Sequence, residues 1–210
     1  MKKFFPYIFI LIVLLQLTGV YLDSLLRLVT KPLIMITLAS YYFAYARNFK
    51  LVFFTAIVAA LMGDIFLMWD HEMSFMLGLC SFLVMQVLYA LIFWNQKDHI
   101  DVIDISISGV IALIAAGLMY ILIPDVDGFL KIAVAIYCFC IMTMVITAIL
   151  REKSHPSYLP VLCGALLFLL SDAILAIDKF SFPMEYGSVM VIGTYMAAQY
   201  LIVLGISDVE

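Results

Sequence analysis

Charged residues are scarce in this chain. Only 12% of its 210 residues are Asp, Glu, Lys or Arg, whereas 67% are hydrophobic. A water-soluble domain typically carries about 25% charged residues, so this sequence cannot cover a soluble surface. The net charge of −4 also leaves no basic patch to neutralise phosphates, which excludes a nucleic-acid partner.

The residue patterns of metal, disulfide and nucleotide chemistry are also missing. The four cysteines fall inside apolar stretches without a CxxC pair, and the three histidines lie at the ends of such stretches without HExxH spacing. The chain contains no GxSxG motif and no phosphate-binding glycine loop. We therefore expect no metal, no cofactor and no disulfide. The WDHE run at residues 69–72 is interpreted as a solvated loop rather than a cation site.

Long apolar stretches dominate what is present. A helix crosses the hydrocarbon core with about 20 mostly apolar residues, whereas a barrel strand alternates apolar and polar residues. The stretch FPYIFILIVLL has no such alternation, which favours helices. The sequence predicts an all-α membrane protein, one integral domain over residues 1–210 with eight transmembrane helices, at Phe4–Leu22, Pro32–Ala46, Leu51–Trp69, Ser74–Trp94, Val102–Ile123, Phe129–Leu150, Tyr158–Ile177 and Gly187–Ile206.

The orientation follows from the basic residues of the loops. The first stretch lacks a clear cleavage site and is interpreted as an uncleaved helix. Cytoplasmic loops carry an excess of Lys and Arg. This rule predicts a multi-pass protein of the cell (inner or plasma) membrane with both termini in the cytoplasm. Seven basic residues lie on the side of the termini (Lys2, Lys3, Arg47, Lys50, Lys97, Arg151 and Lys153) and four on the other (Arg27, Lys31, Lys131 and Lys179).

Two acidic residues fall within the predicted hydrocarbon region, Asp64 and Asp172. An ionisable side chain in a spanning helix costs at least a few kcal/mol and is by default a functional candidate. Each lies five residues before the end of an odd-numbered predicted span, which places both at one depth in the outer half of the membrane. We predict that these two carboxyls are catalytic.

The two acids are also related by an offset of 108 residues. The same offset connects Asp70 with Asp178 and Leu67 with Leu175. Four predicted spans in each half indicate a possible parallel 4+4 internal repeat. Such a repeat would bring the third and seventh spans together around a pseudo-twofold axis.

Further polar residues lie on helix faces. On the fourth span, Gln86 and Tyr89 continue a stripe of Phe and Gly residues at helical spacing. Lys31 opens the second span at the outer boundary. Each of these side chains could instead form interhelical hydrogen bonds or reach toward the headgroups. As candidate substrate-binding residues we take Lys31, Gln86, Tyr89, Ser171, Tyr195 and Gln199.

A pair of carboxyls at one depth favours acid–base chemistry. Mutual repulsion keeps a proton on one of the two, which can then act as general acid while the other acts as general base. Acid-labile bonds that pass through an oxocarbenium-like state suit this arrangement, among them acetals and vinyl ethers.

In combination, several motifs resemble the YhhN-like membrane proteins, the lysoplasmalogenase family. They occur in the right order from about Lys31 to Leu204, and they are KPL at residues 31–33, GD at 63–64, the F-x2-G-x3-F stripe ending in Tyr89, GALLFLLSD at 164–172 and Y-x3-Q at 195–199. One departure concerns residue 86, where members often carry His and this chain carries Gln. Because Gln cannot transfer protons, a role as base is excluded there.

The resemblance implies eight spans and hydrolysis of the vinyl ether bond of lysoplasmalogen. The products would be a fatty aldehyde and glycerophosphoethanolamine or glycerophosphocholine. The partners would be a lysophospholipid substrate and membrane lipids, with the oligomeric state left open. The resemblance places the catalytic acids at Asp64 and Asp172 and the polar pocket at Lys31, Tyr89, Tyr195 and Gln199.

Other functions use intramembrane carboxyls too. A proton-coupled transporter would require helices broken near the midplane, yet proline occurs only at span ends and in loops. An intramembrane aspartyl protease would require GxGD and YD, where this chain has LMGD and SD. A lipid-binding or purely structural membrane protein without hydrolase activity remains an alternative.

Overall fold

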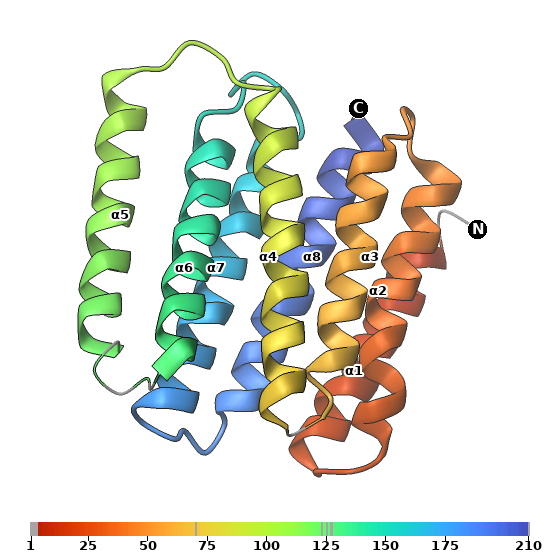
Figure 1. Cartoon of the computed structure of the whole chain (residues 1–210). Coiled ribbons are helices and arrows are strands. Elements are labelled where there is room, and N and C mark those ends of the chain that lie inside the picture. Colours follow the sequence, from red (N-terminus) through yellow and green to blue (C-terminus); the bar gives the residue numbers. More distant parts are fainter. Residues whose placement is uncertain (1–3, 70, 123, 125, 127, 210) are drawn as a thin grey trace.

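The computed structural model describes residues 4–69, 71–122, 124, 126 and 128–209. Within these residues the chain forms eight α-helices joined by short loops (Figure 1). The helices are α1 (Phe5–Tyr21), α2 (Leu26–Tyr45), α3 (Leu51–Phe66), α4 (Glu72–Trp94), α5 (Val102–Leu122), α6 (Gly128–Ile149), α7 (Tyr158–Phe180) and α8 (Gly187–Val209).

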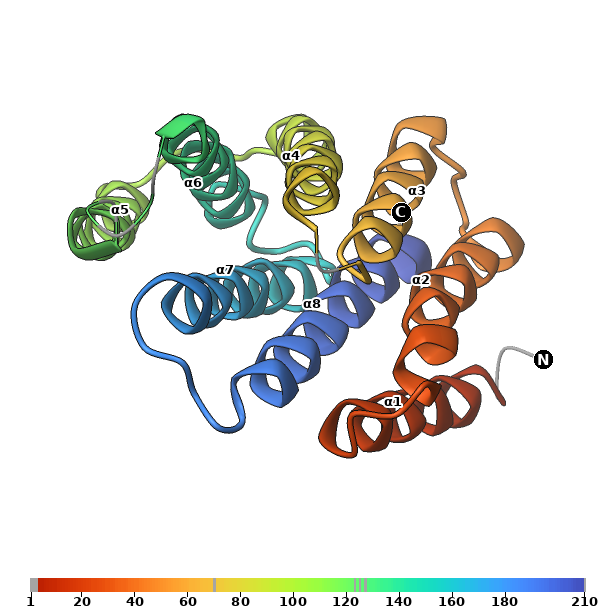
Figure 2. The ribbon, with the colours of Figure 1, turned by 60° about the horizontal axis from the view of Figure 1, so that its bottom comes forward.

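The helices run up and down as one bundle. The α1–α2, α3–α4, α5–α6 and α7–α8 connections lie at its lower end, and the other three connections lie at its upper end (Figure 1). Helix α8 lies deep in the bundle, where it packs on α7, α2 and α1, whereas α5 lies at the outer edge and contacts only α6 and α7 extensively (Figure 2). We refer to the lower end in Figure 1 as the loop-rich lower end.

The length and composition of the helices fit a membrane protein. Five of the described helices are long and apolar enough to cross a bilayer, namely α4, α5, α6 from Leu130, α7 and α8. The apolar helices α1 and α3 are shorter, with 17 and 16 residues. Helix α5 exposes most of its Ile, Leu and Val side chains, as a helix facing lipid would.

Helix α2 begins six residues earlier than predicted, at Leu26 instead of Pro32. The sequence places two cations and a proline in this segment, a composition typical of a loop. In the structure, Arg27 and Lys31 line a polar cavity, which allows the charged first turns to remain helical. Pro32 therefore lies inside the helix, although it cannot donate a backbone hydrogen bond there.

The other predicted spans match helices to within a few residues at each end. Helix α3 ends earlier than predicted, and α7 and α8 extend three residues beyond. Some residues used in the predictions lie outside the described part of the chain, namely Lys2, Lys3, Asp70, which carried one match of the repeat, and Ile123, the predicted end of the fifth span.

Candidate active site

Asp64 lies in the last turn of α3 and is buried. The hydroxyl of Tyr195 on α8 donates a hydrogen bond to its Oδ2 at 2.8 Å. Lys31 on α2 is close enough to interact electrostatically with the carboxylate. The Lys31 ammonium and the Tyr195 hydroxyl each favour the ionised form of this carboxyl and oppose the cost of burying its charge. Asp64 thus connects α2, α3 and α8.

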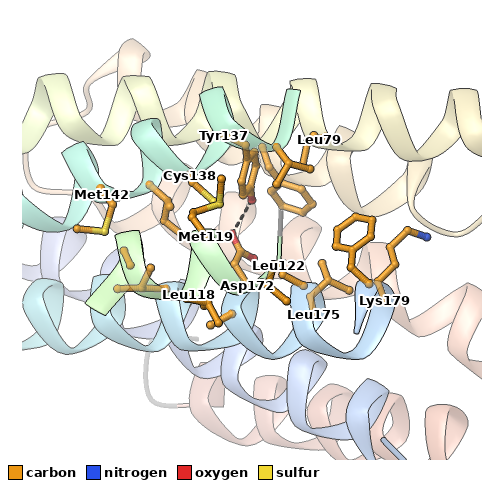
Figure 3. Close-up of a pocket in the computed structure, with 18 of the residues that line it drawn as sticks. Leu79, Leu118, Met119, Leu122, Tyr137, Cys138, Met142, Asp172, Leu175 and Lys179 are labelled. Carbon is orange, nitrogen blue, oxygen red and sulfur yellow. Dashed lines mark hydrogen bonds between the residues drawn. The ribbon is translucent and has the colours of Figure 1, made fainter. Parts of the chain in front are cut away.

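Asp172 lies on α7 and faces a different neighbour. The hydroxyl of Tyr137 on α6 donates a hydrogen bond to its Oδ2 at 2.6 Å, and the two side chains point toward one another (Figure 3). Both residues line an apolar pocket of about 230 Å³ between α4, α5, α6 and α7. Leu, Ile, Met and Phe side chains form most of the remaining wall.

The other predicted polar residues lie around these two carboxyls. On α4, Tyr89 donates a hydrogen bond to Gln199 Oε1 at 2.9 Å, and Gln199 Nε2 donates to the sulfur of Met85 at 3.1 Å. Gln86 is fully buried and lies close to the Tyr137 hydroxyl. Ser171 donates to the backbone carbonyl of Val191 on α8 at 2.9 Å, so it connects α7 to α8 rather than facing a cavity.

Phe82 connects the apolar pocket to the Asp64 side of the site. It lines the pocket, and its ring packs edge-on against Tyr195 at 5.8 Å between centroids. A Cβ on Gly63 would lie 2.8 Å from carbons of the Phe82 ring. The glycine before Asp64 is therefore needed for the close approach of α3 to this ring. Phe82 lines the pocket, whereas Tyr195 and Asp64 do not. Asp64 does not line the polar cavity described below either.

A second, polar cavity of about 620 Å³ opens at the loop-rich lower end, where α1, α2, α4, α6, α7 and α8 meet. Its wall includes three cations and two acids, namely Arg27, Lys31, Lys179, Glu72 and Asp178. The two cavities adjoin, since both are lined by Leu67, Phe75, Leu175 and Lys179. An amphiphile could occupy both, with its charged part in the polar cavity and its chain in the apolar pocket.

The two carboxyls are arranged differently from the sequence prediction, which brought the third and seventh spans together. Asp64 and Asp172 do not share a hydrogen bond among the described residues, and α3 and α7 pack mainly against other helices. Instead, each carboxyl binds the hydroxyl of a different tyrosine. The two tyrosines, Tyr137 and Tyr195, are close enough to interact electrostatically. The two carboxyls and the two tyrosine hydroxyls therefore form a row of buried polar groups across the bundle.

Sequence reasoning missed Tyr137. This tyrosine lies in an apolar segment, AIYCFC, without any polar neighbour that marks a helix face. Only its spatial pairing with Asp172 distinguishes it from the other tyrosines of the chain. For metal binding, no group of three or more His, Cys, Asp or Glu side chains within the described residues could hold an ion.

Comparison with protein families identifies the chain. The model of the YhhN family matches residues 26–206, which include all the site residues named above. The chain belongs to the YhhN family.

Curated proteins with related sequences include mammalian YhhN-like proteins. The chain is 32% identical to "Lysoplasmalogenase TMEM86A" of Bos taurus and 31% identical to the protein of that name from Homo sapiens, over 157 residues in each case. It is 28% identical to the human "Lysoplasmalogenase TMEM86B" over 149 residues. The alignments cover 71–72% of this chain but only 60–63% of these relatives. No solved structure matches this YhhN chain.

Proposed function

We propose that this protein is a lysoplasmalogenase, a membrane hydrolase that cleaves the vinyl ether bond of a lysoplasmalogen. The products are a fatty aldehyde and glycerophosphoethanolamine or glycerophosphocholine. The observation that carries the proposal is Asp172, a hydrogen-bonded carboxyl in the wall of an apolar pocket that adjoins a charged cavity. The names of the curated relatives support the same activity.

The two cavities match the two parts of a single-chain ether lipid. The alkenyl chain occupies the apolar pocket, and the headgroup occupies the polar cavity. There the ammonium of Lys31 binds the lipid phosphate, and Arg27, whose guanidinium pairs with Asp23 at 2.6 Å, lines the same cavity. The vinyl ether then lies near the residues shared by both cavities, within the region of Asp172.

The chemistry assigns different roles to the two carboxyls. Asp172 has no cation among the described residues that interacts with it and faces an apolar pocket, so it is the general acid that protonates the vinyl carbon. The proton leaves an oxocarbenium ion. Asp64, whose carboxylate form is favoured by Lys31 and by the Tyr195 hydroxyl, takes the role of the anion that stabilises this cation through the low-dielectric interior. Paired-carboxylate catalysis is thus retained, although the two carboxyls are not in contact.

The remaining polar residues hold this machinery in place. Tyr195 orients Asp64, while Tyr89 and Gln199 form a hydrogen-bonded pair deeper in the bundle. Ser171 fixes α7 against α8 next to Asp172. Gln86 lies beside Tyr137, the hydrogen-bond partner of Asp172.

We propose further that all eight helices span the membrane as a parallel 4+4 repeat. The helix contacts support this arrangement, since α1·α2, α2·α3 and α3·α4 have counterparts in α5·α6, α6·α7 and α7·α8. The contact of α4 with α6 likewise has its counterpart in that of α8 with α2, which a pseudo-twofold axis requires. With both termini in the cytoplasm of the cell membrane, the polar cavity opens to the outer leaflet.

The decisive experiment is mass spectrometry of the purified protein supplied with lysoplasmalogen. Release of a fatty aldehyde together with the glycerophospho-alcohol is expected, with no release from a diacyl phospholipid. Absence of aldehyde from correctly folded protein would refute the proposed activity. For the orientation, a cysteine introduced by Glu72→Cys should react with an impermeant reagent on intact cells, and one introduced by Glu152→Cys should not. The reverse pattern would refute the orientation.

A further inference from the structure

Gln86 presents an unusual feature in the middle of the bundle. Its side chain is fully buried. The amide interacts with the neighbouring Tyr137 hydroxyl, but no hydrogen bond of good geometry satisfies either its oxygen or its nitrogen among the described residues. Burying a polar group without a partner costs about 1–3 kcal/mol, so such groups usually bind ordered water or a ligand. Two polar atoms without a good hydrogen bond on one buried side chain therefore indicate that a polar molecule binds beside α4.

The surroundings of Gln86 specify what this guest contacts. The amide lies close to the hydroxyl of Tyr137. This hydroxyl donates a hydrogen bond to Asp172 Oδ2 at 2.6 Å. Its oxygen has two lone pairs, so one can still accept a hydrogen bond from a guest besides the interaction with Gln86. Tyr137 and Asp172 line the apolar pocket. A guest here would have the Gln86 amide and the Tyr137 oxygen as partners, within reach of the pocket.

We propose that Gln86 and Tyr137 form the binding site of the hydrolytic water and that Tyr137 relays a proton from this water to Asp172. Water fits because it can donate to Tyr137 while it exchanges hydrogen bonds with the amide of Gln86. The inference rests on the proposed function and names the source of the nucleophile, which the two carboxyls by themselves leave unassigned. It also gives Tyr137 a role in catalysis.

The steps balance in atoms and protons. Asp172 transfers its proton to the outer vinyl carbon, and the electron pair of the double bond forms the new C–H bond, which leaves the oxocarbenium ion. The bound water attacks the cationic carbon and forms a C–O bond. Its proton passes to Tyr137 as the proton of Tyr137 passes to Asp172, which is thereby protonated again. The hemiacetal then breaks its bond to the glycerol oxygen, which takes the hydroxyl proton, and the aldehyde is released.

Competition between water and methanol tests this site. In a water–methanol mixture, methanol that captures the same cation yields a stable mixed acetal instead of aldehyde. A protein that holds its own water should give a lower ratio of mixed acetal to aldehyde than acid hydrolysis of the same lipid in the same solvent. Both products require the same protonation step, so a merely structural defect slows them together and leaves their ratio unchanged.

Two variants remove the site with little change in shape. Tyr137→Phe removes only the hydroxyl, and Gln86→Met keeps the length of the side chain without its polar atoms. Each should raise the ratio of mixed acetal to aldehyde about tenfold, a modest part of what positioning of a reactant contributes. Tyr42→Phe is the matched control, because the Tyr42 hydroxyl accepts a hydrogen bond from the Lys50 backbone N–H at 2.8 Å far from the pocket. It should leave the ratio unchanged.

The possible outcomes separate the two proposals. Active wild-type protein whose ratio does not respond to Tyr137→Phe or Gln86→Met would overturn the water site and leave the proposed function standing. Wild-type protein without any aldehyde product would overturn the proposed function. In that case an experimental structure at high resolution decides the site by itself. An ordered water between Gln86 and Tyr137 is expected, and an empty or apolar-filled space would overturn the proposal.

Discussion

At the scale of single residues, the site consists of two carboxyls in unlike environments. Asp64 has a cation and a tyrosine as neighbours, whereas Asp172 has a tyrosine and an apolar cavity. In low-dielectric surroundings a nearby charge decides which of two carboxyls remains ionised. In the proposed mechanism this difference, rather than mutual contact, separates the role of acid from the role of anion.

Replacement of either carboxyl by the matching amide tests these roles. Asp64→Asn and Asp172→Asn should each lower the rate of aldehyde release by at least about 10²-fold, the low end for lost acid–base catalysis. Asn retains the shape of Asp, but at residue 172 it cannot transfer a proton, and at residue 64 it cannot supply the negative charge that stabilises the oxocarbenium ion. The fold should survive, because a neutral amide is cheaper to bury than a carboxylate. Rates are measured on purified protein, with Asp98→Asn in an exposed loop as control.

The double variant adds a further criterion. Residues that act as one unit have non-additive effects, so the double variant should be little slower than the slower single variant. A folded single variant with near wild-type rates would contradict the two-carboxyl mechanism.

The sequence predicts the two acids but not their partners. A charged residue in an apolar stretch is rare enough to be recognised by itself, which identifies Asp64 and Asp172. A tyrosine is common in such stretches, and this chain has 12 of them. Tyr137 acquires its meaning from a helix 35 residues further along the chain, a relationship that no local pattern encodes.

At the scale of helices, close packing depends on a few glycines. A Cβ on Gly164 of α7 would lie 2.6 Å from Ile202 and 2.8 Å from the backbone oxygen of Ala198, both on α8. Backbone atoms cannot move aside as a flexible side chain can. The glycine therefore permits α7 and α8 to pack together, as small residues do between membrane helices.

Substitution of glycines on two helices measures this effect. Gly164→Ala should lower the stability of the fold by about 1–3 kcal/mol, the usual cost of overpacking. Gly117→Ala on α5, where an added Cβ would meet nothing within 4 Å, should leave stability unchanged or raise it slightly. The midpoint of thermal unfolding in detergent measures both. Equal effects of the two substitutions would show that packing at α7–α8 is not limiting.

Helix α5 is attached to the bundle by an ion pair at its first turn. Lys153, in the α6–α7 loop, contacts Asp104 at 2.8 Å and Asp101 at 3.3 Å. The hydrogen bond with Asp104 raises the pKa of the Lys153 ammonium above its ordinary value. A raised pKa means that the folded state favours the protonated ammonium, so this attachment is complete at neutral pH and is lost only as the pH rises through the raised pKa.

Hydrogen exchange in the first turn of α5 tests this attachment. Lys153→Met should accelerate exchange there at neutral pH, whereas the α7–α8 interface should be unaffected. Because amide exchange is itself catalysed by base, the wild-type rates are divided into the intrinsic rate at each pH to give protection factors. The wild-type protein should lose protection in this turn only in strongly alkaline buffer, above the ordinary lysine pKa of about 10.4. Loss of protection between pH 7 and 9 would contradict this interpretation.

The helix boundaries show where sequence patterns fail. Composition correctly located the eight helices, because each one coincides with a run of mostly apolar residues. It failed at the start of α2, where two cations and a proline resemble a loop. These cations instead face the polar cavity, and that cavity is formed by six helices from distant parts of the chain. A local pattern cannot anticipate such a tertiary environment.

At the scale of the whole molecule, the apolar pocket limits which lipids fit. Its volume of about 230 Å³ is enclosed by four helices, with Asp172 in its wall. Lysoplasmalogen should therefore be hydrolysed much faster than intact plasmalogen, whose second chain has no room beside the first. Aldehyde release from the two lipids, matched in headgroup and alkenyl chain, provides the measurement. Equal rates would mean that the pocket opens widely to the bilayer.

If the protein has the proposed function, the wall that the two cavities share determines where along a lipid the reaction occurs. Leu67, Phe75, Leu175 and Lys179 mark the level at which the lining changes from charged to apolar. The boundary between the polar headgroup and the apolar chain of a lipid should lie at this same level. The headgroup therefore determines which bond of the lipid lies next to Asp172. Longer chains should change affinity but not the bond that is cut. A lipid whose double bond lies one carbon further from the ether oxygen should bind and remain intact.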